Sequence, residues 1–183
     1  MSGLFTGALV RLTVSQPEHD APLWAKWDTD SQYRRLFDSD PPRLHTAAHW
    51  RHELESEGLP DNKGFGFSVR TLDGDKLIGV AHVGILSWVH RDAFAAIGFG
   101  DRNYWGRGYG TDAMGALLRF AFTELALHRV TLNVFAANER AIRSYEKAGF
   151  RHEGRLRQAL LRAGQRTDIV YMGILREEWC GRI

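Results

Sequence analysis

The glycine-rich segment Asn103–Asp112 has a spacing suited to ligand binding, because glycines occupy the alternate positions 106, 108 and 110. Glycine lets the backbone approach a ligand closely and reach φ > 0 without strain. The run that follows has a helical pattern. A helix that begins here directs unpaired N–H groups and the positive end of its dipole at one point. The segment therefore predicts an anion site, most often one for phosphate.

The order of the glycines separates three kinds of phosphate loop. A P-loop requires Gly-x-x-x-x-Gly-Lys-Ser/Thr, and no such string occurs in the chain. A dinucleotide-binding fold requires Gly-x-Gly-x-x-Gly at the start of its β-α-β unit, whereas here the third glycine comes one position early and about 100 residues precede the loop. This mismatch disfavours a nucleotide-binding oxidoreductase. The third kind has a basic or bulky residue, two spacers and then Gly-x-Gly, and Trp105–Gly110 fits that spacing.

A second motif follows about thirty residues later, in Asn138–Phe150, where Asn138 precedes Tyr145 by seven positions and the segment ends in Gly-Phe. With both motifs in this order, the chain resembles the GNAT superfamily of N-acetyltransferases over about residues 8–179. Tyr104 and Trp105, just before the loop, are most similar to the branch that contains ribosomal-protein N-terminal acetylases and spermidine acetylases. Trp105 departs from the family pattern, since many members carry Gln or Arg there.

Apolar periodicity and turn residues predict an α+β or mixed α/β fold. The predicted strands are 9–13, 65–70, 76–86, 93–99, 130–135, 151–160 and 166–175, and the predicted helices are 17–30, 46–57 with Gly58 as its stop, the run after the glycine loop, and 138–148. The resemblance implies a mostly antiparallel central sheet, flanked by helices and splayed at the cofactor site. Gly98 and Gly100 predict a bulge at that splay. We expect a single domain over 1–183, with 8–100 mainly on the acceptor side and 93–179 forming the acetyl-CoA-binding core.

The reaction that the resemblance implies is transfer of the acetyl group of acetyl-CoA to a primary amine, by direct attack in a ternary complex. A non-catalytic acetyl-CoA sensor is the alternative. Main-chain donors of the loop suit the pyrophosphate of the cofactor, and basic side chains of the second motif could reach its phosphates. The predicted cofactor-binding residues are Phe99, Gly100, Trp105, Gly106, Arg107, Gly108, Tyr109, Gly110, Thr111, Asn138, Arg140, Arg143 and Lys147.

Tyr145 is the predicted general acid, because a phenol within hydrogen-bond reach of sulfur can protonate the departing thiolate. Asn138 is expected to cap its helix, and Ser144 is expected on the surface because neighbouring helical residues point about 100° apart. The base that deprotonates the amine is left open between Asp101, Glu153, Asp168 and a chain of water molecules.

The acceptor side is predicted from the aromatic residues of the first two helices and the segment between them. One or two of these rings could bind a cationic amine together with Asp28, Asp38 or Asp40. The aromatic candidates are Trp24, Trp27, Tyr33, Phe37 and Trp50. The acceptor is expected to be a protein N-terminus, a polyamine or another small-molecule amine.

Charge and composition narrow the partners and the compartment. Residues 1–100 hold 13 acidic and 10 Lys or Arg residues, whereas 101–183 hold 9 and 14, which suits an anionic cofactor on the C-terminal half. No dense basic stripe with aromatic residues, no long apolar run, no signal peptide and no metal-ligand spacing occurs, so nucleic acid, a membrane and a metal are not expected. The lone cysteine, Cys180, predicts a reducing cytoplasmic location and is not expected to act as a nucleophile. Homodimerisation is implied by the resemblance only.

Overall fold

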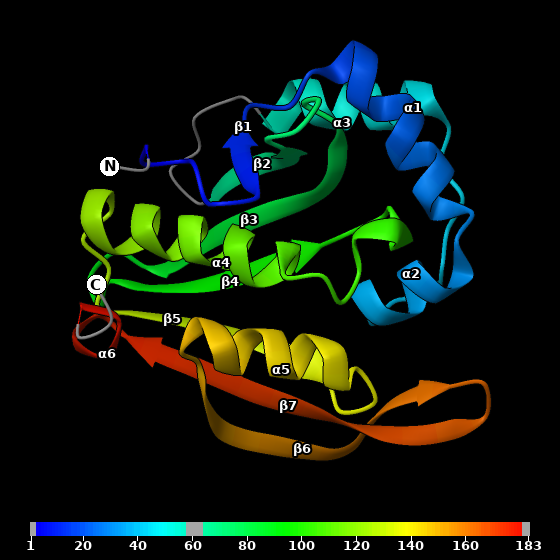
Figure 1. The fold of residues 1–183 in the computed structure, drawn as a ribbon. Helices are drawn as coiled ribbons and strands as arrows, with labels where there is room; N and C mark the ends of the chain where they lie inside the picture. Colours follow the sequence, from blue (N-terminus) through cyan, green and yellow to red (C-terminus); the bar gives the residue numbers. More distant parts are fainter. Residues whose placement is uncertain (1–2, 58–63, 181–183) are drawn as a thin grey trace.

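A seven-stranded sheet runs through the computed structural model, which describes residues 3–57 and 64–180 (Figure 1). The spatial order of its strands is β1-β2-β3-β4-β5-β7-β6. The strands are β1 (Val10–Thr13), β2 (Gly64–Thr71), β3 (Leu77–Ser87), β4 (Asp92–Gly98), β5 (Arg129–Phe135), β6 (Arg151–Arg162) and β7 (Gln165–Leu175). The helices are α1 (Pro17–Asp28), α2 (Ser31–Phe37), α3 (Ala47–Glu57), α4 (Tyr109–Arg119), α5 (Glu139–Ala148) and α6 (Arg176–Cys180). Gly58, the predicted stop of α3, lies outside the described residues.

All neighbouring strands pair antiparallel except β4 and β5, which are parallel. Their pairing covers only Asp92–Phe94 against Arg129–Thr131. Beyond these residues the two strands no longer pair with each other, although β4 continues to Gly98 and β5 to Phe135. The predicted mixed, mostly antiparallel sheet that splays between these strands is therefore confirmed.

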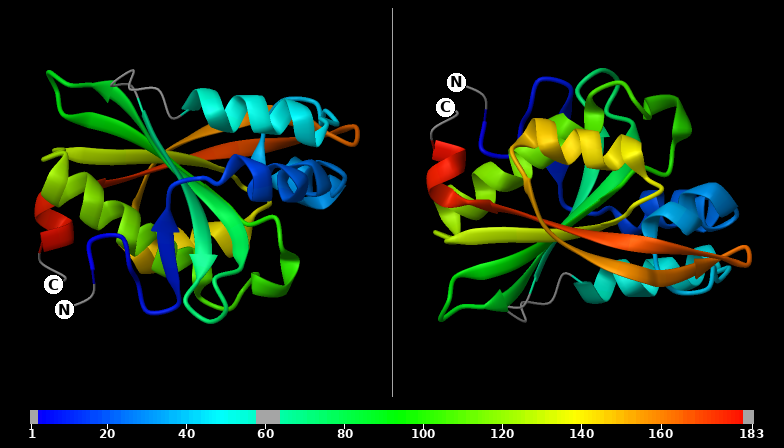
Figure 2. Two further views of the ribbon diagram at one scale, coloured as in Figure 1. Left: turned by 90° about the horizontal axis from the view of Figure 1, so that it is seen from above. Right: turned by 90° about the horizontal axis from the view of Figure 1, so that it is seen from below.

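The helices cover the two faces of the sheet unequally. Helices α4 and α5 lie on one face, α3 lies on the other, and α1 and α2 lie at the end where β4 and β5 separate (Figure 2). The predicted helix after the glycine loop is confirmed, and five apolar residues of its buried face are 1 % exposed or less. Those residues are Met114, Leu117, Leu118, Ala121 and Phe122, the last two in a π-helical turn that extends α4. Among the described residues, no helix is both long and apolar enough to cross a bilayer.

The predicted helix at 17–30 is wrong in its end, and α2 was not predicted. Helix α1 ends at Asp28, and the side chain of Asp30 caps α2 by accepting hydrogen bonds from the N–H groups of Gln32 and Tyr33, both at 3.0 Å. An Asp that bonds the backbone two and three residues ahead starts a helix rather than continuing one. The break turns α2 toward the end of β4, next to the splay.

The predicted bulge at Gly98 and Gly100 is also wrong. Gly98 pairs with Val80 in regular register, and the shift in that strand pair lies between Ile85 and Ser87. The glycines instead make room for aromatic rings. A Cβ on Gly98 would lie 2.4 Å from the ring of Phe37, and one on Gly100 would lie 2.0 Å from that of Trp27.

We expect Gly100→Ala to lower the free energy of unfolding by about 1–3 kcal/mol, because the added methyl group collides with a packed indole ring. Gly115→Ala is the matched control, because its Cβ would meet nothing within 4 Å. In the interior of α4 it should stabilise the protein by roughly 0.5–1 kcal/mol. Urea denaturation of both variants measures the two effects. Equal shifts would contradict the packing role of Gly100.

Candidate active site

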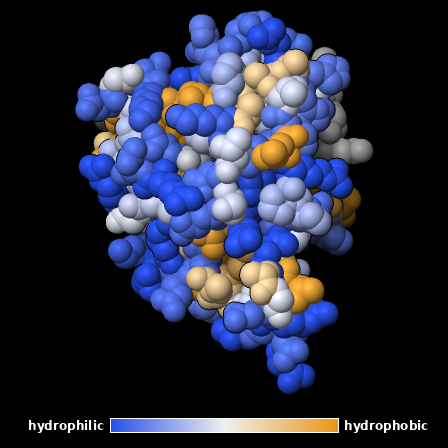
Figure 3. Space-filling model, turned by 90° about the vertical axis from the view of Figure 1, so that its right-hand side faces the viewer, coloured by the Kyte–Doolittle hydropathy of each residue, from blue (hydrophilic) through white to orange (hydrophobic). Residues whose placement is uncertain are grey.

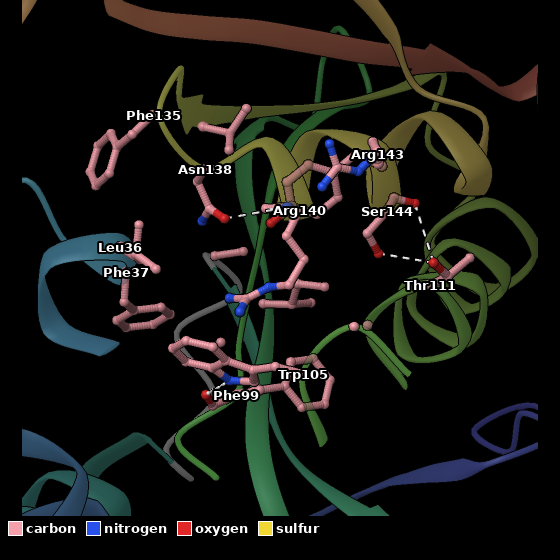
Figure 4. A pocket seen from close by; sticks show the side chains of 18 of the residues that line it. Leu36, Phe37, Phe99, Trp105, Thr111, Phe135, Asn138, Arg140, Arg143 and Ser144 are labelled. Carbon is pink, nitrogen blue, oxygen red and sulfur yellow. Dashed lines mark hydrogen bonds between the residues drawn. The ribbon is translucent and has the colours of Figure 1, made fainter. Parts of the chain in front are cut away.

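A cavity of about 340 Å³ opens where β4 and β5 part. Its walls come from the C-terminal ends of both strands, the glycine loop, α5 and α2. The cavity thus joins the two sequence motifs to the helix that the sequence did not predict. In Figure 4 the side chain of Arg140 extends from α5 toward Trp105, with Leu36 and Phe37 on one side and Thr111 on the other. The cavity therefore has two chemically different ends.

The glycine loop forms the polar end. Gly106 and Gly108 have φ values of 70° and 90°, and Gly108 is the N-cap residue of α4. No side chain caps this helix, so a bound anion would not have to displace a cap from the N–H groups of the first turn. The first acidic residue of α4, Asp112, points away from the loop, because its carboxylate accepts the N–H groups of residues 8–10 at 2.8–3.0 Å. Such a helix start can hold a phosphate group.

Trp105 lines the cavity and contacts both β4 and α5. Its indole N–H donates to the carbonyl of Phe99 at 2.6 Å, which ties the loop to the end of β4. The guanidinium carbon of Arg140 lies 3.7 Å from the centre of the indole ring, within cation–π range. Burial lowers the pKa of Arg140, yet an arginine keeps its positive charge at any physiological pH. The departure from Gln or Arg at position 105 thus supplies a stacking surface.

Ser144 lines the cavity, so its predicted surface position is wrong. Its hydroxyl oxygen lies 2.9 Å from that of Thr111, and this contact joins α5 to the first turn of α4. Arg143 and Lys147 also line the cavity from α5, where Arg143 bonds Glu139 at 3.1 Å. Two cationic side chains therefore line the same cavity as the helix start that can hold an anion.

Asn138 caps α5 as predicted, because its side-chain oxygen accepts the N–H of Ala141 at 3.3 Å. It also lines the cavity. Three predicted cofactor-binding residues direct their side chains elsewhere or have none to offer. Arg107 donates to the carbonyl of Asn103 at 3.1 Å, the ring of Tyr109 packs on Tyr104 with centroids 4.9 Å apart, and Gly100 lies beneath Trp27. None of these three residues lines the cavity.

Tyr145 lies on the cavity wall with 8 % of its surface exposed. Within residues 3–57 and 64–180 its hydroxyl has no hydrogen-bond partner. Burial raises the pKa of the phenol to about 12, while the positive charge of Arg140 acts in the opposite direction. The phenol is therefore protonated throughout the neutral range and is free to donate a hydrogen bond into the cavity.

The three acidic residues predicted as bases do not line the cavity, and each is held in an ion pair elsewhere. Lys76 Nζ lies 2.7 Å from Asp101, Arg129 lies 2.5 Å from Glu153, and Arg155 lies 3.1 Å from Asp168. Burial alone would raise the pKa of Asp101, but hydrogen bonds from Lys76 and from the backbone bring it below its usual value. Among the described residues that line the cavity there is no Asp, Glu or His.

The predicted cation pocket around Asp28 is wrong as well. This buried carboxylate accepts hydrogen bonds from Trp50 Nε1 and from the imidazole of His45, both at 2.8 Å. Asp38 lies 3.5 Å from Arg34, and Asp40 is exposed without lining the cavity. In the part of the chain that is described, no three side chains of His, Cys, Asp and Glu gather as a metal site would require.

The geometry can be compared with known proteins. The acetyltransferase (GNAT) domain family matches residues 11–151. The chain belongs to the GNAT acetyltransferase family. Its resemblance to this family, which the two motifs predicted, is confirmed.

Two GNAT relatives with named substrates are similar to the chain over most of its length. Spermidine N(1)-acetyltransferase of Vibrio cholerae serotype O1 is 30 % identical over 131 residues, which is 71 % of this chain and 74 % of the relative. L-amino acid N-acetyltransferase AaaT of Escherichia coli is 30 % identical over 125 residues, or 68 % and 76 %. The crystal structure of spermidine N-acetyltransferase from Vibrio cholerae in complex with CoA and spermine aligns with a TM-score of 0.81 at 23 % identity, covering 93 % of this chain and 98 % of that one. This likeness confirms the GNAT fold.

Membership in this family settles the class of reaction. The chain is an acyltransferase that uses acetyl-CoA as its co-substrate and transfers the acetyl group to an amine, as the two motifs predicted. The two named relatives act on different amines, so family membership does not fix the acceptor.

We expect Gly108→Ala to weaken acetyl-CoA binding about tenfold, because a strained loop misdirects at least one N–H from the phosphates. Gly74→Ala is the matched control. Gly74 also has a positive φ, of 75°, but lies in the turn between β2 and β3. Each variant should lose roughly 1–2 kcal/mol of stability, since alanine is strained in the left-handed region. Isothermal titration calorimetry with acetyl-CoA separates them, and equal affinities would contradict the role of the loop.

Proposed function

We propose that this GNAT enzyme acetylates a primary amine by direct attack on acetyl-CoA, with Tyr145 as the general acid. The observation that carries the proposal is the Tyr145 phenol, which is buried on the cavity wall and free of hydrogen bonds to the other described residues. We further propose that 93–179 form the acetyl-CoA-binding core of a single domain over 1–183, and that 8–100 mainly form its acceptor side.

The residues of the polar end fit the cofactor. The N–H groups around Gly108 and the first turn of α4 would bind the pyrophosphate, with Arg143 and Lys147 adding charge. The pantetheine arm would lie between Phe99 and Asn138. Its amides would pair with the part of β4 that has no partner in β5, as an added strand does. Acetyl-CoA supplies an activated acyl group as a thioester.

The proposed step is balanced without an acyl-enzyme. The neutral amine attacks the carbonyl carbon, the carbon–sulfur bond breaks, and the sulfur takes the proton of the Tyr145 phenol. The amine releases its own proton to water, and the phenol recovers a proton from solvent. Direct attack is supported by the two aliphatic hydroxyls of the described cavity lining, Thr111 and Ser144, which bond each other and have no Asp, Glu or His beside them in that lining.

We expect Tyr145→Phe to lower kcat by about 10²–10⁴-fold, because the departing thiolate loses its proton donor. The affinity for acetyl-CoA should change little, since the ring that lines the cavity is kept. Steady-state kinetics and calorimetry with acetyl-CoA measure the two quantities. An unchanged kcat would remove Tyr145 from the mechanism. A wild-type protein that binds acetyl-CoA but acetylates no amine would be a sensor.

The pH dependence of kcat/KM should follow the protonation of the acceptor amine rather than that of a carboxylate or histidine of the enzyme. No such group lines the described cavity, so kcat/KM is expected to rise tenfold per pH unit until the amine itself is neutral. The rise should end near pH ~10.4 for a lysine-like amine but near ~8 for an α-amino group. Rate profiles for two acceptors of different pKa test this. A break at the same pH between about 5 and 7 for both acceptors would reveal an enzyme base.

Location and assembly are proposed on other grounds. The single cysteine, Cys180, supports a reducing cytoplasmic location. The family resemblance supports a homodimer, which light scattering of the purified protein would test. The acceptor is proposed to be a small molecule or the amino terminus of a protein.

A further inference from the structure

The acceptor end of the cavity is built from apolar and aromatic side chains. Tyr33, Leu36 and Phe37 come from α2, and Phe135 comes from the end of β5 that has separated from β4. Figure 4 shows Leu36, Phe37 and Phe135 on the opposite side of Arg140 from Thr111 and Ser144. The apolar end is therefore the part of the cavity away from the loop that would hold phosphate.

This aromatic wall is held in place by packing. The rings of Phe37 and Tyr33 stack at 5.3 Å with an angle of 15°, and Tyr33 meets Trp27 edge-on at 6.2 Å. Phe37 also rests directly on the backbone of Gly98, where a Cβ would lie 2.4 Å from its ring. A wall fixed in this way offers a preformed surface to an apolar group, because little side-chain freedom remains to be lost on binding.

The charges of the cavity are all positive. Arg140, Arg143 and Lys147 line it, and none of the described lining residues carries a carboxylate. Asp38, the residue that follows α2, is engaged by Arg34 at 3.5 Å and by the N–H of Asp40 at 3.0 Å. A second ammonium group of a bound acceptor would therefore meet like charge from the cationic side chains that line the cavity and find no carboxylate there to pair with it.

The surface at this end limits how large the apolar group can be. Figure 3 faces the end of the molecule where α1 and α2 lie, and there apolar side chains come to the surface in separate patches between hydrophilic ones. Broad docking surfaces show larger continuous apolar areas than this. The apolar contacts open to an acceptor at this end therefore lie mainly within the cavity of about 340 Å³, which limits the size of the group that they can hold.

We infer that the acceptor is a primary amine with a single positive charge, attached beside an apolar or aromatic group, and that polyamines are poor acceptors. This inference rests on the proposed function. It separates the chain from its relative that is named for spermidine. The same chemistry occurs in a free arylalkylamine and in a peptide whose first residue is apolar.

The first test compares three acceptors at saturating acetyl-CoA, with product identified by mass spectrometry. They are 2-phenylethylamine, a short peptide that begins with phenylalanine, and spermidine. Once each kcat/KM is divided by the fraction of the amine that is neutral at the assay pH, either aromatic amine is expected to exceed spermidine by about 10- to 100-fold, the effect of burying one aromatic side chain. The better of the two aromatic amines identifies the source of the acceptor. Spermidine equal to or better than both would overturn the inference while leaving N-acetyl transfer intact, and no product from any of the three would overturn both.

The second test changes the wall. Phe37→Ala should reduce the preference for aromatic amines about tenfold, and Phe37→Asp should in addition raise the relative rate with spermidine, since it supplies the missing carboxylate. Val89→Ala is the control, because Val89 is 88 % exposed in the turn between β3 and β4. Thermal stabilisation by acetyl-CoA shows that each variant is folded, and Leu36→Ala replaces Phe37→Ala if that variant is not. An unchanged preference in a folded wall variant would overturn the inference.

Discussion

The site depends on the early end of pairing between β4 and β5. After Phe94 and Thr131 the two strands run on without bonding each other. Backbone N–H and C=O groups in a protein interior require partners, so a gap within a sheet is stable only if something else satisfies them. A ligand with amides of its own can form hydrogen bonds with these backbone groups, so the gap between the two strands can serve as a binding site. Every wall of the cavity is arranged around that gap.

The end of β4 also attaches the two halves of the site to each other. Phe37 packs on Gly98, Trp105 donates to the carbonyl of Phe99, and Trp27 packs on Gly100. Three consecutive residues therefore receive a side chain from α2, from the glycine loop and from α1. Helices α1 and α2 and the glycine loop therefore all pack on the same short segment of backbone, which links the two ends of the cavity.

The sequence predicted what depends on local backbone demands. The glycine loop and the Asn138 cap were recognised because few residue types satisfy a positive φ or an exposed helix start. The boundary of α2 was missed because Asp30 continues a plausible helix unless its capping role is recognised. The ion pairs of Asp101 and Glu153 join residues 25 and 24 positions apart, which no local pattern reveals. Ser144 was misplaced because the angular position of a residue around α5 does not reveal that α4 lies beside that helix. Thr111 of α4 is the residue that bonds Ser144.

The absence of an acid from the described cavity and the apolar acceptor end have one chemical consequence. A carboxylate beside the substrate would stabilise the ammonium form, which cannot attack a carbonyl. Apolar surroundings and the positive charge of Arg140 act oppositely, because both disfavour the protonated amine. The same burial that favours a neutral amine raises the pKa of Tyr145 and keeps its phenol protonated. In the proposed mechanism, one environment therefore favours both the neutral amine and the protonated phenol, and the proton given up by the amine leaves through water without a dedicated base.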